Sequence, residues 1–249
     1  IGKVSDDELG QKYEDGLNKE NVKYLYHKKK ESVPTGSCLI LITPDSERTM
    51  CTFLGTAGKI SDNDVNKEHI KNSEIVFLEG YLWDEGDPKR AFDAAIDHSN
   101  KVAMSLSDLF CVERHKAKMR AFVQNDVDIL FCNEGELKAL YETNSLDNAI
   151  AMLKSEVEIG VVTKGENGAI IIEKSLAHEI EAFPTNVVDT TGAGDFFAAG
   201  FLAGISKNYD LVKAGMLGAA CSSEIISHYG GRPENELKEF VKNKAGLEV

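Results

Sequence analysis

The residues best suited to chemistry lie in one segment, 187–200, which reads V-V-D-T-T-G-A-G-D-F-F-A-A-G. The pattern predicts the end of a strand, a turn of small residues and the start of a helix. Gly192 and Gly194 would let a ligand approach the free N–H groups of the first helical turn, where the helix dipole also favours an anion such as phosphate. Asp195 would then lie beside the anion, where its carboxylate could accept the proton of an attacking hydroxyl.

The same segment also has a purely structural interpretation. The glycines could simply permit a tight turn, and Asp195 could be a first-turn acid that the helix dipole stabilises. Neither of the common nucleotide motifs is present to decide the matter. Residues 55–60, G-T-A-G-K-I, have the wrong glycine spacing for a P-loop, and no G-x-G-x-x-G follows an expected strand.

Composition excludes several classes of protein. The 249 residues carry 41 acidic against 28 basic side chains, a net charge of −13, which argues against nucleic acid or an anionic membrane as partner. The longest apolar run, 196–205, is about half the ~20 residues that a membrane-spanning helix needs. Five scattered cysteines without a C-x-x-C pair indicate neither a disulfide framework nor a zinc site. We therefore expect a soluble protein of the reducing cytoplasm.

From residue 74 onward, short strand-like runs alternate with helical patterns. The expected strands are 74–79, 101–106, 127–132 and 159–163, and their spacing suits βαβ units around a parallel sheet. Ligands of such sheets bind beyond the carboxyl ends of the strands. Polar or glycine-rich residues follow each run there: Gly80, 105–108, Asn133 and 163–165.

Two hairpins are also expected. Residues 33–57 hold two extended runs, 35–43 and 48–54, joined by the turn P-D-S-E at 44–47, and this hairpin is interpreted as a flap or lid. The second joins 159–163 to 169–173 through E-N-G at 166–168, where Asn-Gly suits positive φ angles. Without linkers or repeats, residues 1–249 are interpreted as one domain with a lid.

Four motifs together resemble the ribokinase-like carbohydrate kinases, also called the phosphofructokinase-B family. D-T-T-G-A-G-D at 189–195 resembles the family signature, N-E-G-E at 133–136 its N-x-x-E motif, and T-K-G-E-N-G at 163–168 its T-x-G-x-x-G segment. Residues 2–10 are similar to the family's G-x-D-x-x-G stretch. The resemblance implies a three-layer α/β sandwich with a mostly parallel central sheet and a small β lid.

The resemblance also implies roles for individual residues. Gly192, Ala193 and Gly194 would supply the anion hole, and Asp195 would be the general base. Asn133 and Glu136 would organise magnesium and phosphate through water, although the same pair also makes an ordinary capping box. Thr163, Gly165 and Gly168 would line the nucleotide side, with a simple hairpin turn as the alternative.

Three further residues have weaker parallels in the family. Arg48 resembles a lid arginine that reaches the transferred phosphate, but a solvated turn residue would look the same. Asp189 and Thr191, with backbone carbonyls near 227–231, resemble a monovalent-cation site that would take potassium. The alternative for this pair is loop capping.

The implied activity is ATP- and Mg²⁺-dependent phosphorylation of a primary hydroxyl on a small molecule, a nucleoside or a sugar. Adenosine is the first choice, because residues 34–45, 47–50, 77–83 and 105–108 look most like bacterial adenosine-kinase-like members. A sugar such as ribose or fructose is the alternative acceptor. A nucleotide-binding chain without turnover is the alternative from another class of protein.

The resemblance begins partway into the family pattern, and the chain opens at Ile1 rather than Met. Family members carry an earlier segment that supplies a core strand, an acceptor-binding Asp and part of the lid. The domain is therefore expected to be N-terminally incomplete, with a half-built acceptor site and little or no turnover. An unpaired sheet edge would invite pairing with another chain, and a homodimer is one form of such pairing.

Overall fold

The computed structural model describes residues 1–26, 28, 30–44, 48–83 and 87–248. The chain divides into two compact units: unit 1 comprises Ile1–Leu41 and Thr49–Val102, and unit 2 comprises Ile42–Arg48 and Ala103–Val249. A single domain over the whole chain stays a prediction. Within the described residues, no helix combines the length and the apolar character needed to cross a bilayer.

The main sheet has six strands in the order β3-β4-β5-β6-β7-β8. Its strands are β3 (Val76–Glu79), β4 (Val102–Ser105), β5 (Ile129–Asn133), β6 (Ile159–Thr163), β7 (Ala169–Glu173) and β8 (Leu176–Ile180). Neighbouring strands from β4 to β6 run parallel, and β6-β7 and β7-β8 run antiparallel. The predicted α/β class with a mostly parallel sheet is confirmed, and the four predicted strands lie where their sequences indicated.

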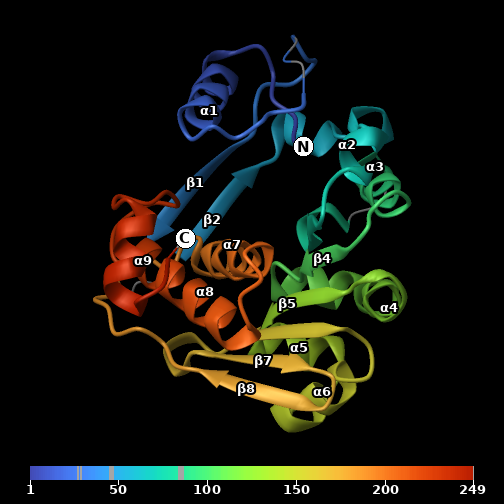
Figure 1. Ribbon diagram of the computed structural model, residues 1–249. Coiled ribbons are helices and arrows are strands. Elements are labelled where there is room, and N and C mark those ends of the chain that lie inside the picture. The colour runs from blue at the N-terminus through green and yellow to red at the C-terminus, as the bar shows by residue number, and fades with distance from the viewer. Residues whose placement is uncertain (27, 29, 45–47, 84–86, 249) are drawn as a thin grey trace. The chain divides into compact units, whose positions relative to one another are not determined.

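Unit 2 places helices on both faces of this sheet (Figure 1). α8 (Leu211–Ile225) covers one face, since a side chain added at its Gly215 would lie 2.7 Å from Ile180 and 3.2 Å from Ile171. α7 (Ala193–Ser206) packs against α8, and α9 (Leu237–Ala245) also contacts it. The other face is covered by α5 (Glu134–Leu140) and α6 (Leu146–Leu153). Because successive strand residues point to opposite faces, β7 is buried between the two helical layers.

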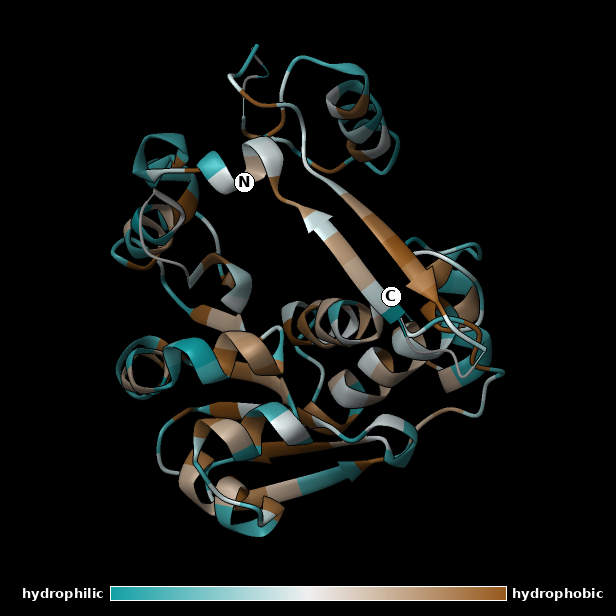
Figure 2. Ribbon diagram, turned by 180° about the vertical axis from the view of Figure 1, so that it is seen from behind, coloured by the Kyte–Doolittle hydropathy of each residue, from teal (hydrophilic) through white to brown (hydrophobic). Residues whose placement is uncertain are grey.

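The core of unit 2 follows from this sandwich. Figure 2 shows the central strands as hydrophobic segments. Fully buried side chains from β5, β6 and β7 include Leu130, Val161 and Ile171. α4 (Leu109–Asp126) adds Val112 and Met119, which are also fully buried. Strands that are covered on both faces require continuous apolar runs. The packing of these strands fixes the positions of the polar residues at their ends.

Unit 1 combines short helices with the beginning of the main sheet. It contains α1 (Glu8–Lys19), α2 (Lys67–Lys71), β3 and α3 (Asp87–Ile96), with 3₁₀ turns at Gly55–Lys59, Asp62–Asp64 and Gly80–Trp83. Asp7 caps α1 and also accepts hydrogen bonds from the backbone N–H and the hydroxyl of Thr35, at 2.8 and 2.7 Å. The N–H of Val76 bonds to the carbonyl of Lys101, which links β3 to the segment that enters β4.

The predicted first hairpin is confirmed as a small antiparallel two-stranded sheet of β1 (Ser37–Ile42) and β2 (Arg48–Phe53). Most of the intervening turn, 45–47, lies outside the described residues. β1 is almost wholly hydrophobic (Figure 2), yet Leu39 and Leu41 are more than half exposed, at 65% and 53%. Whether the pair acts as a lid stays a prediction.

Candidate active site

The start of α7 forms an open turn of the kind that binds anions. Gly192 is the N-cap residue and adopts φ +81°, which a side chain would strain, and no side chain caps the helix. The N–H of Ala193 donates to the carbonyl of Thr190 at 3.3 Å. The N–H groups of Gly194 and Asp195 lie in the first helical turn and therefore have no intrahelical partners. Nothing lies within 4 Å of a Cβ added at Gly194. The first turn is therefore accessible to a ligand.

Asp189 gives this turn its shape. Its side chain is only 1% exposed, and its oxygens Oδ1 and Oδ2 accept hydrogen bonds from the backbone N–H groups of Thr191 (2.9 Å) and Gly230 (3.0 Å). Burial alone would raise the pKa of Asp189, but hydrogen bonds from Thr191 and Gly230 and the charge of Arg48 hold it below its usual value. An ionised carboxylate therefore joins the turn to a distant loop.

A pocket of about 450 Å³ opens beside the turn, entirely within unit 2. It brings together five of the predicted site residues: Thr163, Gly165, Gly168, Ala193 and Gly194. Its other walls include Phe183, Ala219, Ser222, Ser223 and Ile226, which the sequence did not single out. These residues come from α8, the start of the loop after it and the segment that follows β8, and none of them belongs to a motif.

The hairpin turn between β6 and β7 forms part of the pocket wall. Gly165 and Gly168 have positive φ angles of +58° and +78°, whereas Asn167 lies in a 3₁₀ turn with ordinary φ. The expectation of a positive φ at Asn167 was wrong, because the two glycines at the ends of the turn carry that conformation. A Cβ at Gly168 would lie 1.9 Å from the carbonyl oxygen of Ile180. The hairpin itself therefore requires glycine at position 168, and Gly168 also lines the pocket.

Asn133 and Glu136 form a capping box at the start of α5, and neither lines the pocket. Asn133 Oδ1 accepts from the Glu136 N–H, and the Glu136 carboxylate accepts from the Asn133 N–H and amide group at 2.9 and 2.7 Å. Glu136 is 5% exposed. Burial raises its pKa to about 7, the backbone N–H of Asn133 opposes that shift, and the charge of Asp108 adds to it. Glu136 is therefore a buried acid with a pKa of about 7, despite the hydrogen bond that the box supplies.

The side chains of Asp195 and Arg48 interact electrostatically. Burial raises the pKa of the Asp195 carboxyl, and the positive charge of Arg48 opposes that rise. Arg48 belongs to unit 2 and donates from Nη1 to the Thr190 hydroxyl at 3.0 Å. This exposed bond places a guanidinium beside the turn that begins α7. That Arg48 reaches the transferred phosphate stays a prediction.

Cation ligands are sparse here. Among the described residues no group of three His, Cys, Asp or Glu side chains gathers to hold a metal ion. Among the described residues, the buried Thr191 Oγ1 has no partner in hydrogen-bonding geometry, although the hydroxyl helps to lower the pKa of Asp189. Asp189 and Thr191 thus offer a cation one carboxylate and one hydroxyl oxygen.

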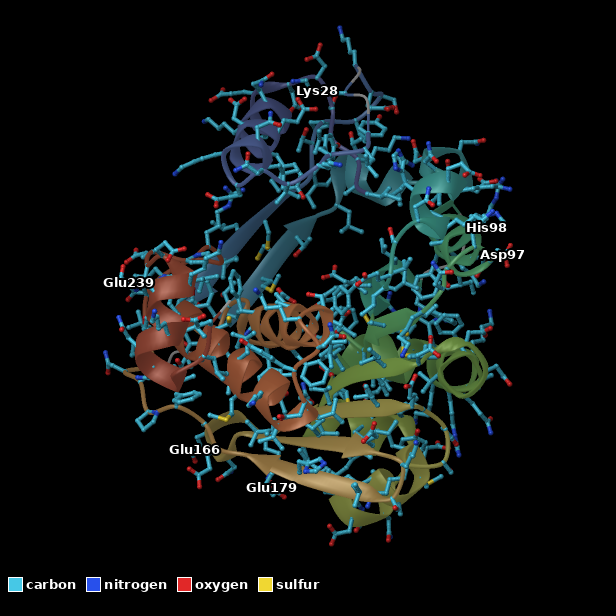
Figure 3. All side chains as sticks on the ribbon, in the orientation of Figure 1. Lys28, Asp97, His98, Glu166, Glu179 and Glu239 are labelled. Atoms are coloured by element: carbon cyan, nitrogen blue, oxygen red, sulfur yellow. The ribbon has the colours of Figure 1, made fainter. Side chains whose placement is uncertain are left out.

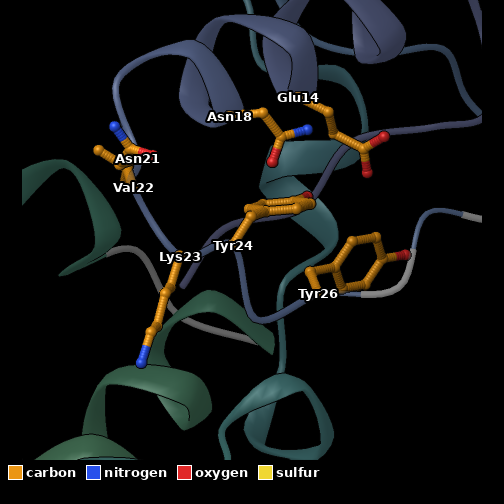
Figure 4. Close-up of a pocket in the computed structure, with 7 residues that line it drawn as sticks. All are labelled: Glu14, Asn18, Asn21, Val22, Lys23, Tyr24 and Tyr26. Atoms are coloured by element: carbon orange, nitrogen blue, oxygen red, sulfur yellow. The ribbon is translucent and has the colours of Figure 1, made fainter.

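A second pocket, of about 470 Å³, lies wholly in unit 1 (Figure 4). It is lined by the end of α1 and the chain that follows, with Tyr24 and Tyr26 packed edge to face at 6.0 Å between ring centres. Glu14 on its rim forms an ion pair with Lys28 at 2.9 Å. None of the predicted site residues lines it.

Comparison with known proteins decides the family. The model of the pfkB family carbohydrate kinases matches residues 1–237. The chain belongs to this family. It is therefore a carbohydrate or nucleoside kinase, an enzyme that phosphorylates a hydroxyl of a nucleoside or sugar with ATP.

Solved structures agree with this assignment. The chain is similar to a probable sugar kinase from Rhizobium etli and to adenosine kinase from Sinorhizobium meliloti, each with 34% identity and a TM-score of 0.92. Both comparisons cover 98% of this chain, and they cover 75% of the Rhizobium etli chain and 76% of the Sinorhizobium meliloti chain. A putative ribokinase II from E. coli, in complex with ATP and Mg²⁺, shares the fold at 20% identity, with a TM-score of 0.89 over 99% of this chain and 82% of that one.

The first prediction tests the open turn. Gly194→Val should fold, because a Cβ added at this position meets nothing within 4 Å, but it should raise the ATP dissociation constant at least about 10-fold by blocking the N–H groups. Calorimetric titration with ATP measures this, and Ala199→Val, at an exposed place on α7, controls for helix propensity. A folded Gly194→Val protein with unchanged ATP affinity would contradict the anion site.

The second prediction follows from the pKa of about 7 at Glu136. The folded chain keeps this proton to higher pH than the unfolded chain does, so the stabilisation is present below the unfolded pKa and is lost as the pH rises through about 7. Relative to Glu136→Gln, the wild type should lose about 2 kcal/mol of stability between pH 5 and pH 8.

Urea unfolding without Mg²⁺ at the two pH values measures this loss. Glu134→Gln is the matched control, because Glu134 lies in the same helical turn but has a side chain 42% exposed. Equal pH dependence in the wild type and Glu136→Gln would show that Glu136 is ionised throughout.

Proposed function

We propose that the turn at 192–195 is the phosphoryl-transfer centre of this kinase. The observation that carries the proposal is the uncapped first turn of α7 beside a pocket that five predicted residues line. N–H groups of that turn would hold the transferring phosphate. The acceptor hydroxyl would attack the γ-phosphorus and give its proton to Asp195, while the bond from that phosphorus to the β,γ-bridging oxygen breaks and ADP leaves.

The nucleotide would occupy the pocket of about 450 Å³. Apolar walls from Phe183, Ala219 and Ile226 suit the face of a base, and the glycines of the β6-β7 turn leave room at the rim. The E. coli protein of the same fold forms a complex with ATP and Mg²⁺, which supports ATP and magnesium as ligands of this fold.

Asn133 and Glu136 would act on magnesium and the phosphates through water. Bound Mg²⁺ would neutralise charge that develops on the phosphates. Glu136 fits a role near a cation, because an acid with a pKa of about 7 ionises readily when positive charge arrives. Its two oxygens already accept from Asn133, which favours an indirect contact through water.

The acceptor is proposed to be adenosine, with a sugar as the second candidate. Equal identity to an adenosine kinase and to a probable sugar kinase supports both. Coupled detection of ADP with adenosine, other nucleosides, ribose and fructose would separate them, with adenosine expected to give the highest kcat/KM. ATP binding without ADP release for any acceptor would favour a nucleotide-binding protein without turnover.

Asp195→Asn is predicted to lower kcat by roughly 10²-fold or more, the usual contribution of a general base, while ATP affinity changes little. Asp147→Asn is the control, since Asp147 is also an acid in the first turn of a helix, α6, and its loss removes only the dipole interaction. If Asp195→Asn turns over within tenfold of the wild type, another group accepts the proton.

Potassium is predicted to raise activity above sodium or lithium at matched ionic strength. Asp189 and the unused Thr191 hydroxyl, with carbonyls of 227–231, would hold the ion, and its charge would reinforce the anion site. Thr191→Val should remove the difference among the salts without leaving an orphaned polar atom. Identical rates of the wild type in all three salts would reject the cation site.

A further inference from the structure

A buried polar cluster lies where α8 ends, outside the residues that the proposed function uses. Glu224 is fully buried, and its Oε1 accepts hydrogen bonds from the backbone N–H groups of Glu234 and Asn235, at 3.1 and 2.9 Å. The amide of Asn235 donates to the same oxygen at 3.0 Å, and His228 Nε2 lies 3.3 Å from it. One carboxylate oxygen therefore joins the beginning and the end of the loop between α8 and α9.

The contacts of His228 favour its charged form. Nε2 faces the Glu224 carboxylate, and Nδ1 lies 3.3 Å from the carbonyl oxygen of Tyr229. Both neighbours are acceptors, so only the doubly protonated ring donates to both. Burial would lower the pKa of His228, but the bonds to Glu224 and Tyr229 and the charges of Glu224 and Glu234 raise it.

Glu224 carries the complementary charge. Burial would raise the pKa of its carboxyl, but the hydrogen bonds from Asn235, His228 and Glu234 more than offset this and hold it below its usual value. A buried ion pair thus fixes the path of the chain through residues 228–235.

The same loop is joined to the phosphate-binding turn by three independent contacts. The Ile226 carbonyl accepts from the N–H of Val188 at 2.9 Å, and the Gly230 N–H donates to Asp189 Oδ2 at 3.0 Å. The Cα of Gly231 lies 3.8 Å from where a Cβ on Gly192 would be. The backbone of the loop therefore packs against the residue that caps α7.

We propose that Glu224 and His228 are positioning residues for phosphate binding: they hold the loop so that the Gly230 N–H reaches Asp189 and keeps the α7 turn open to the nucleotide. The inference rests on the proposed function of that turn. Neither residue touches the phosphate; each acts through Gly230 and Asp189.

A role in stability alone does not account for this pair. Glu224 Oε2 is buried and has no hydrogen-bond partner among the described residues. Burying a carboxylate with one oxygen unpaired costs free energy, and apolar side chains often replace buried ion pairs without loss of stability. A role in positioning the loop gives a functional reason for the buried charge of Glu224, which packing alone does not require.

The test measures ATP affinity of the full chain by calorimetry in Glu224→Gln, in His228→Phe and in the double variant. Glu224→Gln keeps an acceptor but removes the charge, and His228→Phe keeps a ring without its nitrogens. Each single variant should weaken ATP binding about 3- to 10-fold, and the double variant should be no weaker than the worse single variant, because the two residues act as a unit. Asn235→Ala, which removes one donor to Glu224, is the milder variant if either of these fails to fold.

Two controls separate positioning from loss of stability. Glu156→Gln removes a buried carboxylate that accepts from Tyr141 at 2.8 Å and pairs with Arg120, away from the loop. Glu239→Gln removes an exposed one on the outer side of α9 (Figure 3). Both should bind ATP within about twofold of the wild type, even where Glu156→Gln melts at a lower temperature.

Steady-state kinetics give a second readout. A variant that is merely less stable has fewer folded molecules and loses apparent kcat at unchanged KM, whereas a displaced turn raises the KM for ATP. Unchanged ATP affinity and KM in folded Glu224→Gln, with Gly194→Val still impaired, would overturn the positioning role alone. If Gly194→Val also binds ATP normally, the proposed phosphate site fails, and the positioning role fails with it.

Discussion

The buried carboxylate of Asp189 is the contact on which the candidate site depends. It accepts one N–H from the turn at Thr191 and one from the distant loop at Gly230. A buried charge is tolerated only when hydrogen bonds satisfy it, so the turn and the loop must both adopt the geometry that supplies those donors. This requirement keeps Gly192 in its positive-φ conformation and leaves the first N–H groups of α7 for a ligand.

Two acids of the site respond in opposite ways to burial. Asp189 receives N–H donors from two separate segments, and its pKa falls below the usual value. Glu136 is bonded only to Asn133, so burial prevails and raises its pKa to about 7. The neighbouring charges also differ in sign: Arg48 lowers the pKa of Asp189, whereas Asp108 raises that of Glu136. An ionised Asp189 suits a structural or cation-binding role, and a titratable Glu136 suits a response to incoming positive charge.

Much of the fold followed from local patterns. β6 and β7 have the predicted bounds, because apolar residues flank a glycine-rich turn in an unambiguous way. The turn and the helix start at 192–193 were also predicted, whereas the expected strand end at 187–188 is not a strand. The chemistry of 189–195 stays a prediction. Contacts between residues far apart in the sequence could not be predicted. The bond from Arg48 to Thr190 joins residues 142 positions apart, and the α8 residues that line the pocket belong to no motif.

The same limit applies to the loop after α8. His228 is buried against Glu224, and no sequence pattern indicated that the pair would reach Asp189 through Gly230. The acceptor, the lid and the homodimer stay predictions.

The central claim is that the α7 turn binds the transferring phosphate, and a crystal structure of the chain with a non-hydrolysable ATP analogue and Mg²⁺ tests it most directly. The account predicts the terminal phosphate within hydrogen-bond distance of the N–H groups of Gly194 and Asp195, with the base in the pocket of about 450 Å³. An analogue bound with its phosphates elsewhere, and this turn still open to solvent, would contradict it.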